Sequence, residues 1–189
     1  MSQGRKIVVA ITGASGSIYA KRLLEYLAQM PSQYSCVDLV FSKNAKEVWK
    51  HELEEKSFNK YGFKEFDSMD FYAPFASGSA GYDMMIVCPS SMGTLGRIAN
   101  GISNDLITRT ADVMLKEGKE LILVPRETPF NLIHLRNMTQ LAEAGAVIIP
   151  AIPSFYSKPE TIEQVVDTVV HRILQRADFE LDSFRWGEK

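Results

Sequence analysis

The stretch Lys6–Leu27 reads KIVVAITGASGSIYAKRLLEYL, and its pattern decides the fold. Its first part, Lys6–Thr12, is a nearly continuous apolar run rich in β-branched residues, which predicts a strand buried on both faces. From Ser17 to Met30 the apolar residues recur at helical spacing, and Pro31 marks the end of the predicted helix. A buried strand, a loop of small residues and an amphipathic helix together indicate the first unit of an α/β fold.

The same alternation continues along the chain. Further strands are predicted at Val37–Phe41, Met84–Cys88, Glu120–Pro125 and Ala146–Ile149. Helices are predicted at Asn44–Lys56, within Met92–Lys116, at Leu132–Ala144 and from about Pro159 onwards, while Phe58–Phe75 is the least regular segment. Strands that alternate with helices predict a doubly wound parallel sheet, a flavodoxin- or Rossmann-like three-layer sandwich. Because the 189 residues contain no linker-like break in composition, we expect a single domain over residues 1–189.

Composition and charge exclude several classes of protein. Hydrophobic residues make up 46% of the chain and charged residues 23%, which is typical of a globular domain. A formal net charge of −2 provides no basic field for nucleic acid. No apolar run approaches the ~20 residues of a membrane-spanning helix, and Met1–Lys6 leads into no secretory cleavage site. Cys36 and Cys88 form neither a zinc-binding nor a disulfide pattern, so we expect a cytoplasmic protein. The charge and the lack of a long apolar run predict no nucleic-acid or membrane partner.

The loop after the first predicted strand has the residues of a phosphate site. Ligands of an open parallel sheet bind beyond the carboxyl ends of the strands, where the strand order reverses. Gly13, Ala14 and Ser15 let a ligand approach the backbone, and N–H groups at a helix N-terminus favour phosphate. The dinucleotide pattern GxGxxG is absent, because Ser15 and Ile18 stand where it requires glycine, so a mononucleotide phosphate or a flavin edge fits better. The alternative is a plain strand–helix turn capped by Ser15.

Three other turns have residues of the same kind. Ser42 follows the second strand and is placed to cap the next helix, in which Glu47 reads as a solvated residue of the first turns. Ser91–Thr94 follows the third strand and fits either a second anion cradle or a plain cap. The small, hydroxyl-rich turn Ala76–Gly81 fits either a flat ligand or a flexible connection.

Two charged residues leave the sheet after the fourth strand, at Arg126 and Glu127, between Pro125 and Pro129. Arginine offers bidentate donors for phosphate, and a glutamate beside it can donate or accept a proton. A surface ion pair, worth ~0–1 kcal/mol, leaves the rigid flanking prolines unexplained. We therefore expect this loop to take part in anion chemistry.

The last part of the chain adds Tyr156 after the fifth strand and Arg172 on the last helix. One interpretation is that both side chains reach a phosphate. The alternative is that Tyr156 is a half-buried aromatic residue and Arg172 a surface charge. The three histidines lie on predicted helices without a second ligand at suitable spacing, so we predict no metal site; they are His51, His134 and His171.

Several motifs, in order, resemble the UbiX/Pad family of flavin prenyltransferases, long described as aromatic-acid decarboxylases. They are GASGSIYA, SKNAKEVW, ASGS, the Ser-Met-x-Thr-Leu loop, TRTADVMLKE, VPRETPFNLIHLRNM and PSFYSKPET, and the likeness runs from Ile7 to Arg185-Trp186. The resemblance implies a homododecamer with FMN at a junction between subunits. It also implies transfer of a dimethylallyl group from dimethylallyl phosphate to reduced FMN, whose prenylated product serves UbiD-type decarboxylases. Two departures are Gly93, where relatives commonly have lysine, and the exchanged order of Cys88 and Pro89.

The resemblance also implies roles for residues that match the motifs. FMN is expected to bind at Gly13, Ala14, Ser15, Ser42, Ser91, Met92, Gly93, Thr94 and Arg126. Lys116, Glu127, Tyr156 and Arg172 are expected to hold or protonate the dimethylallyl phosphate, and Ser15 and Glu47 to assist proton movement.

The chemistry of these residue types agrees with that assignment. Breaking an allylic C–O bond leaves a phosphate that cationic side chains stabilise and a carboxylic acid can protonate, without a divalent metal. Two alternatives remain at this point: an FMN-dependent decarboxylase of aromatic acids, and an FMN-carrying subunit of a larger complex. The sequence does not indicate which pathway uses the product. It also does not indicate whether the donor is a phosphate or a pyrophosphate.

Overall fold

The computed structural model describes residues 4–55, 57–184 and 187. Its six strands form one parallel sheet in the order β3-β2-β1-β4-β5-β6, which is the strand order of the Rossmann-type doubly wound fold. The strands are β1 (Arg5–Ile11), β2 (Tyr34–Phe41), β3 (Lys64–Phe66), β4 (Met84–Ser90), β5 (Glu120–Pro125) and β6 (Val147–Ile148). The predicted doubly wound parallel sheet is therefore confirmed, whereas one domain for all of residues 1–189 stays a prediction.

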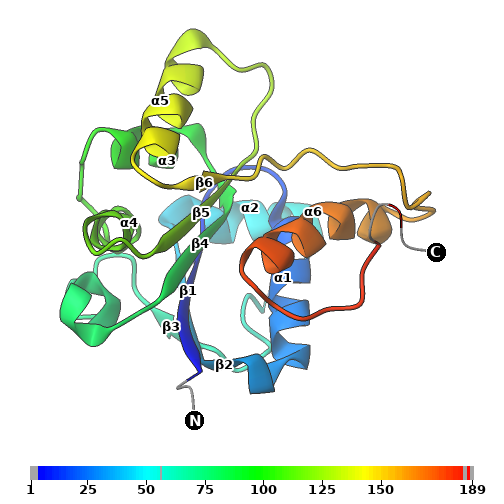
Figure 1. Cartoon of the computed structure of the whole chain (residues 1–189), viewed down its shortest axis with the longest axis horizontal. Coiled ribbons are helices and arrows are strands. Elements are labelled where there is room, and N and C mark those ends of the chain that lie inside the picture. The colour runs from blue at the N-terminus through cyan, green and yellow to red at the C-terminus, as the bar shows by residue number, and fades with distance from the viewer. Residues whose placement is uncertain (1–3, 56, 185–186, 188–189) are drawn as a thin grey trace.

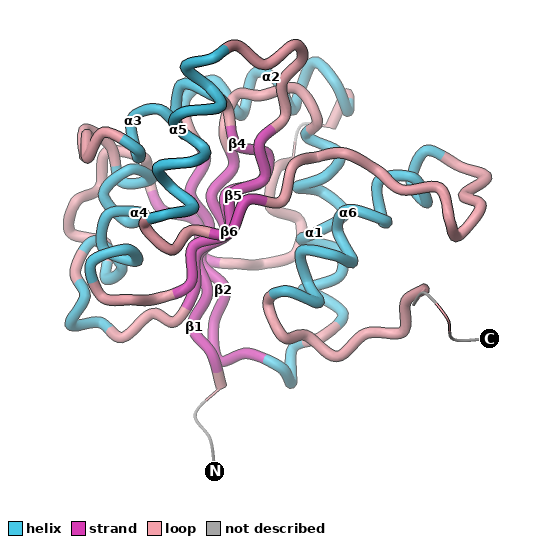
Figure 2. Tube along the Cα trace, turned by 45° about the horizontal axis from the view of Figure 1, so that its top comes forward, coloured by secondary structure: helices cyan, strands magenta, loops and turns pink. Residues whose placement is uncertain are grey.

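Helices cover both faces of the sheet and make three layers (Figures 1 and 2). They are α1 (Ser17–Gln29), α2 (Lys43–Leu53), α3 (Met92–Ala99), α4 (Leu106–Lys116), α5 (Leu132–Glu143) and α6 (Ile162–Arg176). Short 3₁₀ turns lie at Pro31–Gln33, Pro74–Ala76 and Gly78–Ala80. Helices α1, α2 and α6 pack on one face, and α3, α4 and α5 on the other (Figure 2). No helix within the described residues is both long and apolar enough to cross a membrane.

Strand β1 shows why the core divides in this way. Ile7, Val9 and Ile11 are buried against α1, α2 and α6, while Val8 and Ala10 are buried against the opposite helices. Because successive side chains of a strand point to opposite faces, a continuous apolar run is required when both faces are covered.

The observed elements differ from the predicted ones in several bounds, and one strand was not predicted. Strand β3 lies within the segment predicted to be irregular, since its three residues are too short for a periodic signal. The helical segments predicted within Met92–Lys116 are α3 and α4, and Asp105 forms a capping box with Thr108 at the start of α4. The last helix begins at Ile162, after an N-cap at Thr161, and not near Pro159. Helix α2 ends at Leu53, and its predicted end at Lys56 lies outside the described residues, as do Met1–Gln3 and Arg185-Trp186.

The strand order reverses between β1 and β4, which run side by side. A threonine connects the loops that leave their carboxyl ends. The Thr12 hydroxyl donates to the Pro89 carbonyl oxygen at 2.7 Å and accepts from the Ser91 N–H at 2.7 Å. Ligands of this fold bind at the switch point, and here the two loops at that point form one connected surface.

Candidate functional site

Three helices begin at the carboxyl edge of neighbouring strands. The Ser42 and Ser91 hydroxyl oxygens cap α2 and α3 by accepting from the Ala45 and Thr94 N–H groups, both at 3.2 Å. Helix α1 differs, because its N-cap residue is Gly16 at φ 109°, which has no side chain of its own to cap the helix. The plain turn capped by Ser15 is therefore not what forms. Helix N-termini carry partial positive charge, so this edge of the sheet is suited to an anion.

The loop after β1 is held in an open conformation. A Cβ at Gly13 would lie 2.7 Å from the Asn44 Cβ, so glycine is needed for the loop to pack against the start of α2. Among the described residues, the N–H groups of Gly13, Ala14 and Ser15 donate to no other group of the chain. These donors suit the phosphate or the polar ring edge of a flavin mononucleotide, and the residues present therefore fit that group.

The loop at the start of α3 also leaves space for a ligand. A Cβ at Gly93 would meet no atom within 4 Å, so the position faces open space and has room for the lysine common in relatives. Met92 and Thr94 are buried beneath it, and the Ser91 hydroxyl donates to the Thr94 hydroxyl oxygen at 3.0 Å. The structure thus places the predicted set Ser91–Thr94 at the same edge as the loop after β1.

The carboxylate that reaches the first loop is Glu52, near the end of α2. It accepts from the Gly16 N–H at 2.9 Å and from the Ser17 N–H at 2.7 Å. Burial raises the pKa of Glu52, but hydrogen bonds from the Ser15 hydroxyl and from these two N–H groups outweigh it, so the net pKa is below the ordinary value. Glu52 therefore stays ionised while it is bonded to the Ser15 hydroxyl.

Glu47, the carboxylate expected to assist Ser15, lies elsewhere. Its side chain is 74% exposed and pairs with Lys50 at 3.3 Å on the outer side of α2. Helical periodicity explains the difference, since Ala45 and Trp49 are buried and Glu52 follows at the same spacing, whereas Glu47 lies about half a turn away. That periodicity was the available signal for Glu52, which sequence reasoning missed.

Arg126 connects the end of β5 to the first loop. Its Nε donates to the Ser15 carbonyl oxygen at 2.9 Å, and its N–H donates to the Ser90 carbonyl oxygen at 3.3 Å. Glu127 is exposed, and its carboxylate accepts from the Thr128 N–H at 3.0 Å. The structure records no ion pair between Arg126 and Glu127 in the described chain, so Arg126 holds the first loop while Glu127 stays exposed.

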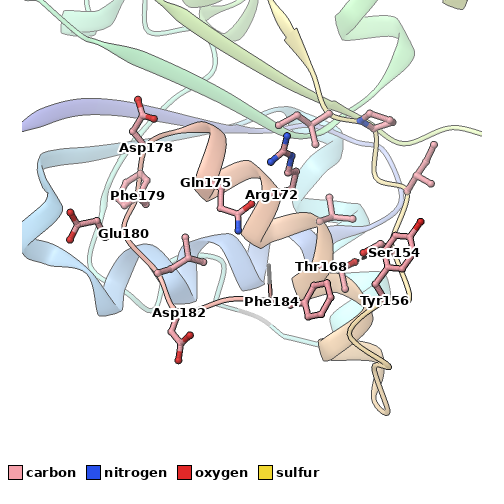
Figure 3. A pocket seen from close by; sticks show the side chains of 15 residues that line it. Ser154, Tyr156, Thr168, Arg172, Gln175, Asp178, Phe179, Glu180, Asp182 and Phe184 are labelled. Atoms are coloured by element: carbon pink, nitrogen blue, oxygen red, sulfur yellow. Dashed lines mark hydrogen bonds between the residues drawn. The ribbon is translucent and has the colours of Figure 1, made fainter. Parts of the chain in front are cut away.

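Tyr156 and Arg172 line a cavity of about 1220 Å³ beside this edge (Figure 3). Its walls are the segment after β6, the helix α6 and the chain segment Asp178–Phe184 (Figure 3). The Ala151 N–H donates to the Pro125 carbonyl oxygen at 2.9 Å, which joins the cavity wall to the end of β5. The two residues predicted to hold a phosphate thus share one cavity, whose wall is bonded to Pro125, the residue before Arg126.

Lys116 is not brought to this site within one chain. It is the last residue of α4, which leads into the amino end of β5, and its Nζ pairs with Glu117 at 2.7 Å. The turn Ala76–Gly81 lies at the same amino edge, because a Cβ at Gly78 would overlap the Glu117 side chain. Two motifs of the family resemblance are therefore gathered at the edge opposite to the other site residues.

The described residues contain no group of three or more His, Cys, Asp or Glu side chains arranged to hold a metal ion. Both cysteines are free thiols, and burial raises the pKa of Cys88.

A Rossmann-type sheet whose first loop offers the N–H donors of Gly13–Ser15, with an arginine at the switch point, is typical of a mononucleotide-binding α/β protein. A model of the flavoprotein family matches residues 1–174. The flavin prenyltransferase UbiX of Methanocaldococcus jannaschii is 46% identical over 185 residues, which cover 96% of this chain and 98% of that protein. The chain belongs to the flavin prenyltransferase UbiX family, as its motifs predicted.

Solved structures agree with this assignment. The dodecameric FMN-dependent UbiX-like decarboxylase of Escherichia coli O157:H7 superposes with a TM-score of 0.92 at 39% identity, over 97% of this chain and all of that one. AnUbiX (PadA1), in complex with FMN and dimethylallyl pyrophosphate, superposes with a TM-score of 0.90 at 41% identity, over 98% of this chain. Both confirm the predicted flavodoxin-like sandwich.

Proposed function

We propose that this chain is a flavin prenyltransferase, which moves a dimethylallyl group from dimethylallyl phosphate to reduced FMN. The observation that carries the proposal is the switch-point cluster, in which Arg126 and Glu52 both bind the backbone of the Ser15–Ser17 segment, together with near-full-length similarity to UbiX proteins. Reduced FMN supplies the nucleophilic N5 and C6 atoms that receive the five-carbon group. Prenylated FMN is the proposed product, for use by a UbiD-type decarboxylase.

The backbone of the first loop and the capped starts of α2 and α3 hold the flavin in this proposal. The N–H groups of Gly13, Ala14 and Ser15 are available donors, and the Ser42 and Ser91–Thr94 segments add donors at the neighbouring strand ends. Arg126 orients the loop by its bond to the Ser15 carbonyl oxygen and supplies a positive charge. Pre-set donors of this kind stabilise negative charge without reorganisation.

The donor phosphate is held by Arg172 and Tyr156 in the adjoining cavity. As the allylic C–O bond breaks, the electron pair stays on the phosphate, and arginines next to it stabilise the growing charge. Glu127 projects from the intervening loop and can donate a proton to the leaving phosphate oxygen. Holding both reactants together removes a large part of an entropic barrier that reaches ~7–11 kcal/mol.

Ser15 and Glu52 act together on a proton. The Glu52 carboxylate accepts the hydrogen bond of the Ser15 hydroxyl, and its lowered pKa keeps it ionised at neutral pH. The Ser15 oxygen can therefore take up a proton from bound substrate while its own proton passes to Glu52. We assign to Glu52 the role that the family resemblance implied for Glu47.

Lys116 joins the site from a second copy of the chain in this proposal. It lies with the Ala76–Gly81 turn at the amino edge, so only a neighbouring subunit can bring both to the switch point. The dodecameric assembly of the similar E. coli protein supports a homododecamer here. The free thiols of Cys36 and Cys88 support a reducing compartment, and we propose the cytoplasm.

Mass spectrometry of the flavin tests the proposal. After anaerobic incubation with reduced FMN and dimethylallyl phosphate, the flavin should be heavier by one C5 unit. An unchanged flavin mass would refute prenyl transfer. Release of CO₂ from an aromatic acid by the pure protein alone would instead support the decarboxylase that the name of the E. coli structure describes.

A further inference from the structure

A carboxylate lines the region proposed to receive the donor phosphate. A second cavity of about 290 Å³ lies beside the larger one, and Ser154, Thr168 and Arg172 line both. Asp167 lines the smaller cavity and is 9% exposed. Because Asp167 and Arg172 line the same small cavity, an uncompensated charge on Asp167 should repel a phosphate dianion bound there, since charges in a partly desolvated site interact strongly.

The negative charge of Asp167 is compensated from another helix. Arg22 of α1 donates from Nε to Asp167 Oδ1 at 2.8 Å and from Nη2 to Asp167 Oδ2 at 2.7 Å. Tyr26, one turn further along α1, donates its hydroxyl to Asp167 Oδ2 at 3.0 Å. Burial, followed by the bond to Asp167, raises the pKa of Tyr26, so its hydroxyl remains a donor at neutral pH. A bidentate arginine contact of this kind is a strong, charge-assisted pairing for a carboxylate.

We propose that Arg22 determines how tightly the donor phosphate binds, by cancelling the charge of Asp167 at the cavity that Arg172 lines. Arg22 lies on α1 and lines neither cavity, so it acts through Asp167 and is a positioning residue. The inference rests on the proposed function, because it takes Arg172 as the phosphate ligand.

The surrounding charges leave Arg22 as the essential cation. On α1, Glu25 also pairs with Arg22, at 2.6 Å, and accepts from the Tyr61 hydroxyl at 3.1 Å. Lys60 lies 4.0 Å from Glu25 and 3.8 Å from Glu55, so it adds positive charge beside Glu25, but within the described residues it forms no ion pair with Asp167. On α6, His171 contacts the Tyr26 hydroxyl at 2.8 Å, and burial keeps the pKa of His171 below its ordinary value. His171 is thus mostly neutral at pH 7, and Arg22 carries the compensation of Asp167.

Binding of dimethylallyl phosphate to the assembled full-length protein tests the inference. The protein is loaded with oxidised FMN, which cannot react, and binding is measured by calorimetry. Arg22→Gln should weaken donor binding by about three- to tenfold, and raise the donor KM without a comparable fall in kcat. Asp167→Asn should bind at least as tightly as the wild type. Arg22→Gln combined with Asp167→Asn should return donor binding to within about twofold of Asp167→Asn, because no uncompensated charge remains.

Lys21→Gln is the matched control. Lys21 is the neighbouring residue on α1, is similarly exposed, and pairs with Glu55 at 2.6 Å. Its loss removes the same charge from the same helix but should leave donor binding unchanged. Unaltered binding in Arg22→Gln, or a double variant as weak as Arg22→Gln, would overturn the inference. If Arg22→Gln does not fold, a loss of donor affinity in Asp167→Asn overturns it, and an unchanged or higher affinity supports it.

The pH dependence provides a readout that a merely structural role would not move. The positive charge of Arg22 contributes to the lowered pKa of His171, so removing Arg22 raises that pKa. As the pH falls, protonated His171 then replaces the missing charge beside Asp167. The deficit of Arg22→Gln relative to the wild type should therefore shrink at acid pH and grow at alkaline pH. A deficit independent of pH would contradict compensation. Two other results would instead contradict the proposed function itself. These are a wild type that forms no heavier flavin, and an Arg172→Gln variant that still binds the donor.

Discussion

Replacing Glu52 by glutamine tests the core of the switch-point geometry. Glu52 Oε2 accepts from both Gly16 and Ser17 N–H groups, and Oε1 lies 3.0 Å from the Gly16 nitrogen. A glutamine keeps the shape but loses the charge, and its NH₂ group cannot accept a hydrogen bond. Charged hydrogen bonds contribute about 1.5–3 kcal/mol and a negative charge at a helix N-terminus about 0.3–1 kcal/mol. Since glutamine recovers part of this, we expect Glu52→Gln to lower the free energy of unfolding by about 2 kcal/mol.

Denaturant unfolding measures this loss, with Glu47→Gln as the control. Glu47 is on the same helix but is exposed and pairs only with Lys50 in the described chain, so its loss should change stability by less than about 0.5 kcal/mol. For a chain of this size, 2 kcal/mol corresponds to about 4–8 °C in Tm. Equal stability of the two variants would refute the role of Glu52 at the α1 N-terminus.

The pH dependence of stability tests whether ionised Glu52 is the source of the stabilisation. Because the folded pKa of Glu52 is lowered, its contribution is present above the ordinary carboxyl value of 4.5 and is lost as the pH falls through the folded pKa. The stability gap between the wild type and Glu52→Gln should thus be full at pH 7 and shrink in acid. A gap that stays constant would contradict an ionised Glu52 as its source.

The same pair of variants tests the proton role. Without a carboxylate beside the Ser15 hydroxyl, the rate of prenyl transfer should fall by about 10²–10⁴-fold, while FMN binding is kept. Glu47→Gln should retain the wild-type rate. The formation rate of the heavier flavin is the assay, and equal rates in the two variants would refute the assignment to Glu52.

Three other outcomes are expected. Gly16→Ala should destabilise the protein by about 1–2 kcal/mol and weaken FMN binding, because φ is 109° and a Cβ would lie 3.0 Å from the Tyr19 ring; unchanged fluorescence titration of FMN would contradict this. Glu127→Gln should abolish most prenyl transfer without altering the Kd of FMN, and full activity would rule out Glu127 as the proton donor. Lys116→Ala and Glu127→Gln should each be inactive alone but regain activity when the two variants are assembled into one oligomer, because some sites then receive an intact residue from each subunit. No recovery would argue against a site shared between subunits.

The alternation of elements was predictable because it depends on local periodicity. The strand Lys6–Thr12 and the helix from Ser17 were predicted to within a residue or so of their observed bounds, since burial on two faces and on one face leave different patterns. The first loop and the Arg126-Glu127 pair were also located correctly at strand ends, where ligands of such sheets bind. Strand β3 was missed, because three residues carry no measurable period.

Which carboxylate lies beside Ser15 depends on the angular position of each residue around α2. The family resemblance placed Glu47, one turn into α2, beside Ser15, but the buried face of that helix passes through Trp49 and Glu52. Knowing which face meets the first loop requires the packing of α2 on the sheet, which sequence order alone does not contain.

By itself, the sequence determined that this chain is a doubly wound α/β protein with an anion site at its strand ends, because hydrophobic period and loop composition are local properties. Only the tertiary structure decided which residues meet. Arg22 and Asp167 lie 145 positions apart yet share two hydrogen bonds, while Lys116 lies at the edge opposite to Glu127 although few residues separate them. The reason is physical: side-chain proximity follows from strand order and helix rotation, which are set by the packing of the whole core.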